Sequence, residues 1–205
     1  DKECQFELFL SFIVKNGRAV LYPVLKGTFE RINEATIQIY EEEGKGNISS
    51  RQYTDLWIDQ IRDFLRCIDY LESRPDIDHQ KLAYSGYSWG SHTAPIILAL
   101  EERIKAAILQ NGGFFIYWGS GGPVRPEVNE MNYVTRVKTP TLMLNGRYDL
   151  FFPYETNARI MFGRLGTPKD QKGQKVYDSD HYVPRNELIK ETLRWFDKYL
   201  GPVKR

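Results

Sequence analysis

The chain is poor in cysteine and histidine, and both shortages limit the kinds of metal or redox site that it can contain. Its 205 residues include two cysteines, Cys4 and Cys67, which are too far apart for metal-ligand or redox spacing. We therefore expect two reduced thiols, with Cys67 on the buried face of a helix. With three histidines in the whole chain, no cluster has the pattern of a metal site. The sequence thus predicts no metal and calls for no cofactor.

Long apolar runs and an excess of one charge are also missing. No apolar run approaches membrane-spanning length, and the N-terminal residues carry no signal-peptide pattern, so we expect no membrane partner. Lys and Arg number 28 and Asp and Glu number 27, giving a formal net charge of +1. Such a balance does not favour binding to nucleic acid. The default location for such a chain is the cytoplasm, and nothing in the composition indicates an oligomeric state.

Strand-like and helix-like segments alternate along the chain. Strands are expected at residues 18–25, 81–85, 104–109, 140–145 and 174–177, and helices at 4–14, 54–74, 91–100, 153–165 and 187–200. Residues 43–50, rich in Gly and Ser, indicate a solvated loop. Alternation of this kind is typical of the α/β class, with a mostly parallel sheet and helices on both faces. The length suits a single domain over residues 1–205.

The sequence Gly-Tyr-Ser-Trp-Gly at residues 86–90 joins a predicted strand to a predicted helix. In that setting Gly-x-Ser-x-Gly predicts a sharp turn that exposes a strained Ser88. We expect both glycines to be required, because a side chain at either position would collide with the neighbouring strand or helix. The helix directs N–H groups at the reacting centre, so the backbone N–H of Trp89 is a candidate oxyanion donor. The alternative is an ordinary Gly/Ser turn.

A serine hydroxyl is a poor nucleophile near neutral pH and needs a base beside it. His79 lies in a polar stretch that indicates a surface turn, and His92 lies inside the helix after Ser88, where we expect it to pack or cap. His181 follows the predicted strand at 174–177. A loop at the end of a late strand can bring His181 over Ser88, so it is the expected general base.

The group that orients the base has three candidates. Asp149 follows the predicted strand at 140–145, in the loop Gly-Arg-Tyr-Asp. Asp178 and Asp180 are its rivals because they lie beside His181. Residues so close in sequence usually point away or cap the next turn, which favours Asp149.

In the chain order serine, acid, histidine, these residues resemble the α/β-hydrolase superfamily. Within it, the chain is similar to the dienelactone-hydrolase and prolyl-oligopeptidase-like branch, and most of all to hydrolase domains that some bacterial proteins carry behind a serine/threonine-kinase region. The runs that carry the likeness are residues 12–23, 69–78, 86–90, 142–149 and 178–181. The resemblance implies an α/β-hydrolase fold and hydrolysis through an acyl-enzyme, with no substrate named.

The resemblance also implies a missing part. In related folds a second oxyanion donor follows a strand that lies, in space, between those expected at 18–25 and 81–85. We expect residues 4–14 to be the helix after that strand, so the N-terminal strands are missing. The chain is then a piece of a larger, multidomain protein, and we expect it to be less active and less stable than its parent.

Aromatic residues are dense after the strand at 104–109, among glycines that oppose a regular strand. Residues 111–130 are therefore a candidate lid on the side where open α/β sheets bind ligands. Phe115, Tyr117 and Trp118 are candidate substrate contacts, as is Tyr87 next to Ser88. The alternative is that the aromatics only cover the sheet edge.

Three functions stay open at this point. The favoured one is a serine hydrolase acting on a small-molecule ester or related acyl compound, through Ser88, Asp149 and His181. A serine peptidase of the prolyl-oligopeptidase type is a narrower variant. The third is a non-catalytic, hydrolase-like binding module, which has no physical need for all three residues.

Overall fold

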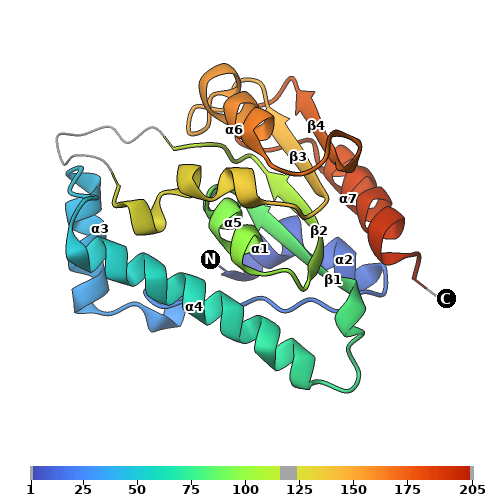
Figure 1. The fold of residues 1–205 in the computed structure, drawn as a ribbon, viewed down its shortest axis with the longest axis horizontal. Helices are drawn as coiled ribbons and strands as arrows, with labels where there is room; N and C mark the ends of the chain where they lie inside the picture. The colour runs from blue at the N-terminus through green and yellow to red at the C-terminus, as the bar shows by residue number, and fades with distance from the viewer. Residues whose placement is uncertain (1, 116–123, 204–205) are drawn as a thin grey trace.

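Four parallel strands form one sheet in the computed structural model, which describes residues 2–115 and 124–203. Their order in the sheet follows the chain, β1-β2-β3-β4, and every neighbouring pair is parallel (Figure 1). The bounds are β1 Leu82–Tyr87, β2 Ile104–Gln110, β3 Thr141–Gly146 and β4 Lys172–Tyr177. The predicted α/β class with a parallel sheet is confirmed.

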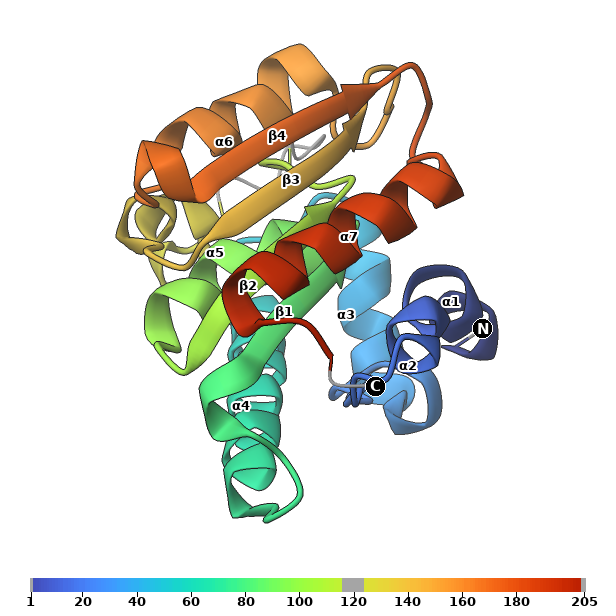
Figure 2. The same cartoon turned by 90° about the vertical axis from the view of Figure 1, so that its right-hand side faces the viewer.

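Helices cover both faces of this sheet, as Figures 1 and 2 show. One face packs against α4 (Arg51–Ser73), α5 (Trp89–Leu100) and α6 (Arg159–Arg164). The other packs against α7 (Arg185–Leu200), with α1 (Lys2–Phe9) and α2 (Ser11–Lys15) beside it. A further helix, α3 (Glu34–Gly44), contacts α4. Among the residues that the structure describes, none of the helices is both long and apolar enough to cross a membrane.

Strand β2 shows how the sequence builds two cores at once. Ala107 and Leu109 point into the core shared with α5, whereas Ile108 points into the core shared with α7. Side chains alternate along a strand, so a strand buried on both faces is apolar throughout. Ile108 has no exposed surface, and burying such a side chain contributes about 1.5–3 kcal/mol.

Helix α4 confirms the helix expected at residues 54–74, with an earlier start. Ser50 accepts a hydrogen bond from the N–H of Tyr53, and this cap begins the helix at Arg51. Trp57, Ile61 and Ile68 are buried along the predicted apolar stripe. The long helix is therefore held by one amphipathic face.

The strand expected at residues 18–25 is absent, which corrects the sequence prediction. Strand β1 pairs with β2 alone, and a strand exists only where a neighbouring backbone supplies hydrogen bonds. Residues 18–25 are held by side chains instead. Arg18 contacts Asp197 and the carbonyl of Gly201, and Val20 packs against the α7 core.

Three other predictions need adjustment. The helix expected at 4–14 is two helices, α1 and α2, which are separate at Leu10. Helix α3 was not predicted, although Asn33 and Thr36 form a capping box at its start. The loop expected at 43–50 therefore begins after α3, and Ile48 within it is only 2% exposed.

Cys4 and Cys67 are both free thiols. Cys4 is exposed and Cys67, on α4, is partly buried. Burial raises the pKa of the Cys67 thiol, and the nearby Asp63 carboxylate adds to that effect. A raised pKa disfavours the reactive thiolate.

Candidate active site

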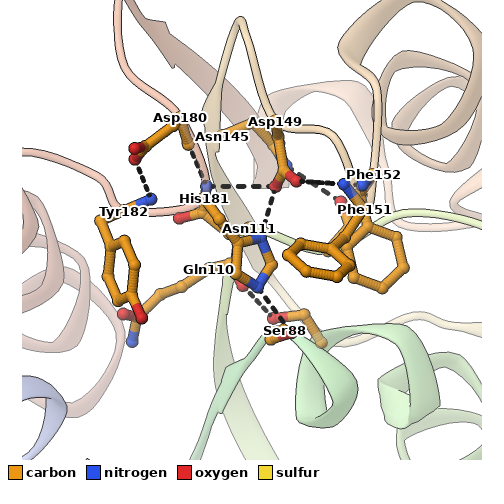
Figure 3. A network of polar contacts seen from close by, with 12 residues as sticks. Ser88, Gln110, Asn111, Asn145, Asp149, Phe151, Phe152, Asp180, His181 and Tyr182 are labelled. Atoms are coloured by element: carbon orange, nitrogen blue, oxygen red, sulfur yellow. Dashed lines mark hydrogen bonds and ion pairs between the residues drawn. The ribbon is translucent and has the colours of Figure 1, made fainter.

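The carboxyl ends of all four strands meet at one edge of the sheet, and each is followed by a polar side chain. Ser88 follows β1, Asn111 follows β2, Asp149 follows β3 and His181 follows β4 (Figure 3). Because the strands are parallel, residues far apart in sequence converge there. The structure thus brings together the three residues that the sequence singled out, and adds Asn111.

Ser88 sits on a strained turn between β1 and α5. Its φ is 51° and its ψ −108°, a combination that costs free energy for a residue with a side chain. Its N–H donates to the carbonyl of Gln110. A Cβ at Gly86 would lie 2.7 Å from the backbone of Gly90, so glycine is required at 86. At Gly90 a Cβ would meet only the Tyr84 hydroxyl, at 3.6 Å. The expected steric need for glycine at 90 is therefore not seen.

His181 lies between Ser88 and Asp149. Its Nε2 is 2.7 Å from the Ser88 Oγ, and its Nδ1 is 2.8 Å from the Asp149 Oδ2. With the proton on Nδ1, the imidazole donates to the carboxylate and its Nε2 accepts from the serine hydroxyl. This continuous chain of hydrogen bonds is the geometry that activates a serine.

Asp149 is almost fully buried, and its carboxylate is surrounded by donors. Oδ1 accepts from the N–H groups of Phe151 and Phe152, at 2.9 and 3.0 Å, and Oδ2 accepts from His181. Burial raises the pKa of this carboxyl. The hydrogen bonds and the charge of His181 outweigh that effect and hold the pKa below its ordinary value. Asp149 is therefore ionised near neutral pH.

The rival carboxylates make other contacts. Asp178 has an 81% exposed side chain and pairs with Arg147, at 3.2 Å. Asp180 accepts from the N–H of Tyr182, capping the next turn. Asp149 is the aspartate whose carboxylate contacts the His181 ring.

The other two histidines lie away from the Ser88 hydroxyl. His79 contacts the carbonyl of Arg74 near the surface. His92 is fully buried on α5, as expected, with its Nδ1 3.2 Å from the carbonyl of Gly113. Its ring lies among aromatic side chains: Trp57, Trp89, Phe115 and Phe152.

The predicted substrate contacts have varied surroundings. The Tyr87 hydroxyl donates to the carbonyl of His181, so it is engaged with the protein. Phe115 is half-buried against Trp89 and Phe152. Tyr117 and Trp118, and with them the centre of the candidate lid at 111–130, lie outside the described residues.

Trp89 has two separate environments. Its ring packs against Trp57, with ring centroids 4.8 Å apart, while its backbone begins α5. The first N–H groups of a helix have no acceptor within the helix. Two adjoining cavities of about 120 and 300 Å³ share Trp89, Leu25 and Gln60 in their linings. Neither of these two linings includes Ser88, Asp149 or His181.

Sequence reasoning missed two features here. Asn111 could have been noticed as a polar residue directly after a buried strand. An exposed apolar pair, Leu150 and Phe151, was also missed; the Phe151 and His181 ring centroids lie 4.8 Å apart. Among residues 2–115 and 124–203, no group of three or more His, Cys, Asp or Glu side chains is placed to hold a metal ion.

Replacing Gly146 with alanine should both destabilise the protein and disturb the site. A Cβ there would lie 1.8 Å from the carbonyl oxygen of Asp180, so the loop that carries His181 would have to move. We expect a loss of about 3 kcal/mol in the free energy of unfolding, measured by urea titration.

Gly163→Ala is the matched control: it lies in α6 with nothing within 4 Å of its added Cβ. Its free energy of unfolding should rise by about 0.5–1 kcal/mol. Equal stability of the two variants would contradict the close packing of the loop.

Comparisons with known proteins bear on the family and the fold of this chain. A model of the dienelactone hydrolase family matches residues 18–163. A cold-adapted esterase from an Arctic intertidal metagenomic library is 22% identical with a TM-score of 0.56; the match covers 75% of this chain and 66% of that one. Acylaminoacyl peptidase of Pyrococcus horikoshii is 16% identical with a TM-score of 0.58, over 80% of this chain and 29% of that one. These identities establish a shared fold.

Curated relatives include peptidases much longer than this chain. Dipeptidyl-peptidase 5 of Porphyromonas gingivalis is 24% identical over 172 residues, which are 68% of this chain and 25% of that protein. An uncharacterized peptidase of Bacillus subtilis is 22% identical over 184 residues, which are 76% of this chain and 27% of that protein. The chain thus spans about a quarter of the length of these relatives.

Proposed function

Because this chain belongs to the dienelactone hydrolase family, we propose that it is a serine hydrolase that cleaves an ester through an acyl-enzyme. In this proposal Ser88 is the nucleophile, His181 the general base and Asp149 the residue that orients it. The observation that carries the proposal is the unbroken chain of hydrogen bonds from Ser88 through His181 to Asp149, at 2.7 and 2.8 Å.

The reaction follows from the placement of the protons. His181 Nε2 takes the hydroxyl proton as Ser88 Oγ bonds to the carbonyl carbon, and Asp149 stabilises the imidazolium that forms. The N–H of Trp89 donates to the oxygen that becomes negative. The bond to the alcohol then breaks, and His181 returns the proton to the departing oxygen. Water, deprotonated by the same imidazole, then attacks the acyl carbon. The bond to Ser88 Oγ breaks as His181 returns the proton to that oxygen, which releases the acid.

Two observations favour catalysis over simple binding. A binding module gains nothing from a serine held at φ 51°, since that conformation costs free energy that a relaxed residue would save. It likewise gains nothing from a buried carboxylate with a lowered pKa behind a histidine. We propose an ester rather than a peptide because a peptide needs a long surface or a deep pocket to position it, and the two cavities beside Trp89 are not lined by Ser88, Asp149 or His181.

Labelling with a fluorophosphonate probe tests this function, because the probe reacts with an activated serine. We expect a single adduct on Ser88, located by mass spectrometry of the digested protein, and none after heat unfolding. A parallel panel of aryl esters and aryl amides of the same acyl group should show ester cleavage well above amide cleavage. A folded protein that stays unlabelled, or is labelled elsewhere, would contradict the proposal. Faster amide cleavage would favour the peptidase variant.

A further inference from the structure

The loop that carries His181 is held by side chains from two other strand ends. Asn111, directly after β2, donates from Nδ2 to the carbonyl of Asp180 at 3.2 Å. Tyr87, at the end of β1, donates from its hydroxyl to the carbonyl of His181 at 3.1 Å. Two consecutive carbonyls of the loop thus accept hydrogen bonds from side chains that lie 94 and 69 positions earlier in the sequence. Figure 3 shows the Asn111 side chain between Asp149 and the loop.

Tyr87 is fixed in place by its ring. The ring stacks on Phe9 of α1 with centroids 3.9 Å apart and an interplanar angle of 18°. Tyr182 lies at 5.9 Å and 26°, also stacked. With its ring packed against both of these rings, the hydroxyl is held at the His181 carbonyl. Because Tyr87 directly precedes Ser88, this one hydrogen bond ties the turn of the nucleophile to the loop of the base.

Asn111 carries a conformational cost that the fold does not explain. It is 1% exposed, and its φ of 46° lies in the left-handed region, which costs free energy outside glycine. Its amide Nδ2 also lies 3.4 Å from the Asp149 Oδ2. Its Oδ1 is buried with no hydrogen-bond partner among the described residues. Only the NH₂ group of this buried amide has hydrogen-bond partners, which indicates that the side chain is positioned to donate.

We propose that Tyr87 and Asn111 are positioning residues that clamp the His181 loop, so that the imidazole stays between Ser88 and Asp149. Tyr87 fixes the distance between Ser88 and His181, and Asn111 holds the loop next to Asp149. The clamp rests on the proposed function, since it acts on the same hydrogen-bond chain. It explains why Tyr87, beside the nucleophile, turns its hydroxyl to backbone and not to open space.

The test uses substitutions that remove only the clamping atoms. Tyr87→Phe deletes one hydroxyl and keeps the stacked ring, and Asn111→Gly removes the amide while suiting a positive φ. Displacing a catalytic group by about 1 Å costs roughly 100-fold in rate. We therefore expect kcat on an aryl ester to fall roughly 10- to 100-fold in each variant, with KM nearly unchanged. The fluorophosphonate labelling rate should fall in proportion, whereas the urea midpoint should stay within experimental error for Tyr87→Phe.

Tyr148→Phe is the matched control, because Tyr148 lies exposed on the loop that follows β3 at the same sheet edge. It should keep the kcat of the parent chain. In the double variant Tyr87→Phe/Asn111→Gly, the losses should not be additive in free energy, because both residues hold one loop.

The outcomes separate the clamp from the function on which it rests. If the parent chain is folded yet unlabelled by the probe, the proposed function fails. If the parent is labelled at Ser88 and Tyr87→Phe keeps its kcat within twofold, the clamp is refuted while the function stands. A loss confined to KM in both variants would also overturn the clamp, because it would assign these residues to substrate binding.

Discussion

Replacing Ser88 by alanine should reduce kcat by roughly 10⁶-fold, the loss typical of a serine that acts as one unit with its base. The hydroxyl that donates to the Nε2 of His181 at 2.7 Å is then gone, and no acyl-enzyme can form. Steady-state hydrolysis of an aryl ester measures the loss. His181→Ala should cost about as much. The double variant Ser88→Ala/His181→Ala should be no slower than either single one, because each alone disables the unit.

Ser85→Ala is the control for the Ser88 substitution. Ser85 lies on β1, three residues before Ser88, and its hydroxyl accepts from the Gln110 amide at 3.3 Å. We expect turnover within a few-fold of the parent chain, since this hydroxyl is bonded to a side chain outside the proposed reaction. Retention of more than a hundredth of the activity by Ser88→Ala would point to another nucleophile.

Asp149→Asn should lower kcat by about 10⁴-fold. The substitution keeps the size of the side chain and an oxygen for the N–H groups of Phe151 and Phe152. It removes the negative charge and places an amide beside the His181 Nδ1. The imidazole then adopts the other tautomer, with its proton on Nε2. In that form Nε2 no longer accepts the proton of the Ser88 hydroxyl. Stopped-flow or steady-state ester hydrolysis, compared at equal folded fraction, measures the change.

Asp178→Asn is the matched control, since it changes the same kind of side chain three residues before His181. Its carboxylate is exposed and paired with Arg147, and exposed pairs contribute little. We expect activity within twofold of the parent. A loss at Asp178 as large as that at Asp149 would reopen the choice of acid that the sequence left between them.

The local part of the fold was predictable because it depends on short-range chemistry. The buried strand β2 is apolar on both faces, and α4 carries its stripe at helical spacing with Ser50 at its start. Such patterns act over a few residues and need no distant partner. The chain order of Ser88, Asp149 and His181 likewise suggested a shared site, because parallel strands end at one edge.

The missed parts depend on partners that a linear pattern cannot identify. Residues 18–25 have the composition of a strand, but strand formation needs a neighbouring backbone, and β1 pairs with β2 alone. The Tyr87 hydroxyl looked available to a substrate; its hydrogen bond to His181 spans 94 positions. Asn111 gave a faint signal, because it is a polar residue after a buried strand. The role that we propose for it follows only from the folded structure, in which four strand ends converge.

By itself the sequence determined the chemical groups of this protein and their local settings: a serine on a strand-to-helix turn, and an aspartate and a histidine after later strands. Tertiary structure alone decided which aspartate contacts His181, because the buried Asp149 and the exposed Asp178 differ in surroundings rather than in type. It also decided that Tyr87 and Asn111 hold the His181 loop. The physical reason is that hydrogen bonds act over about 3 Å, and only the folded sheet brings such distant residues within that range.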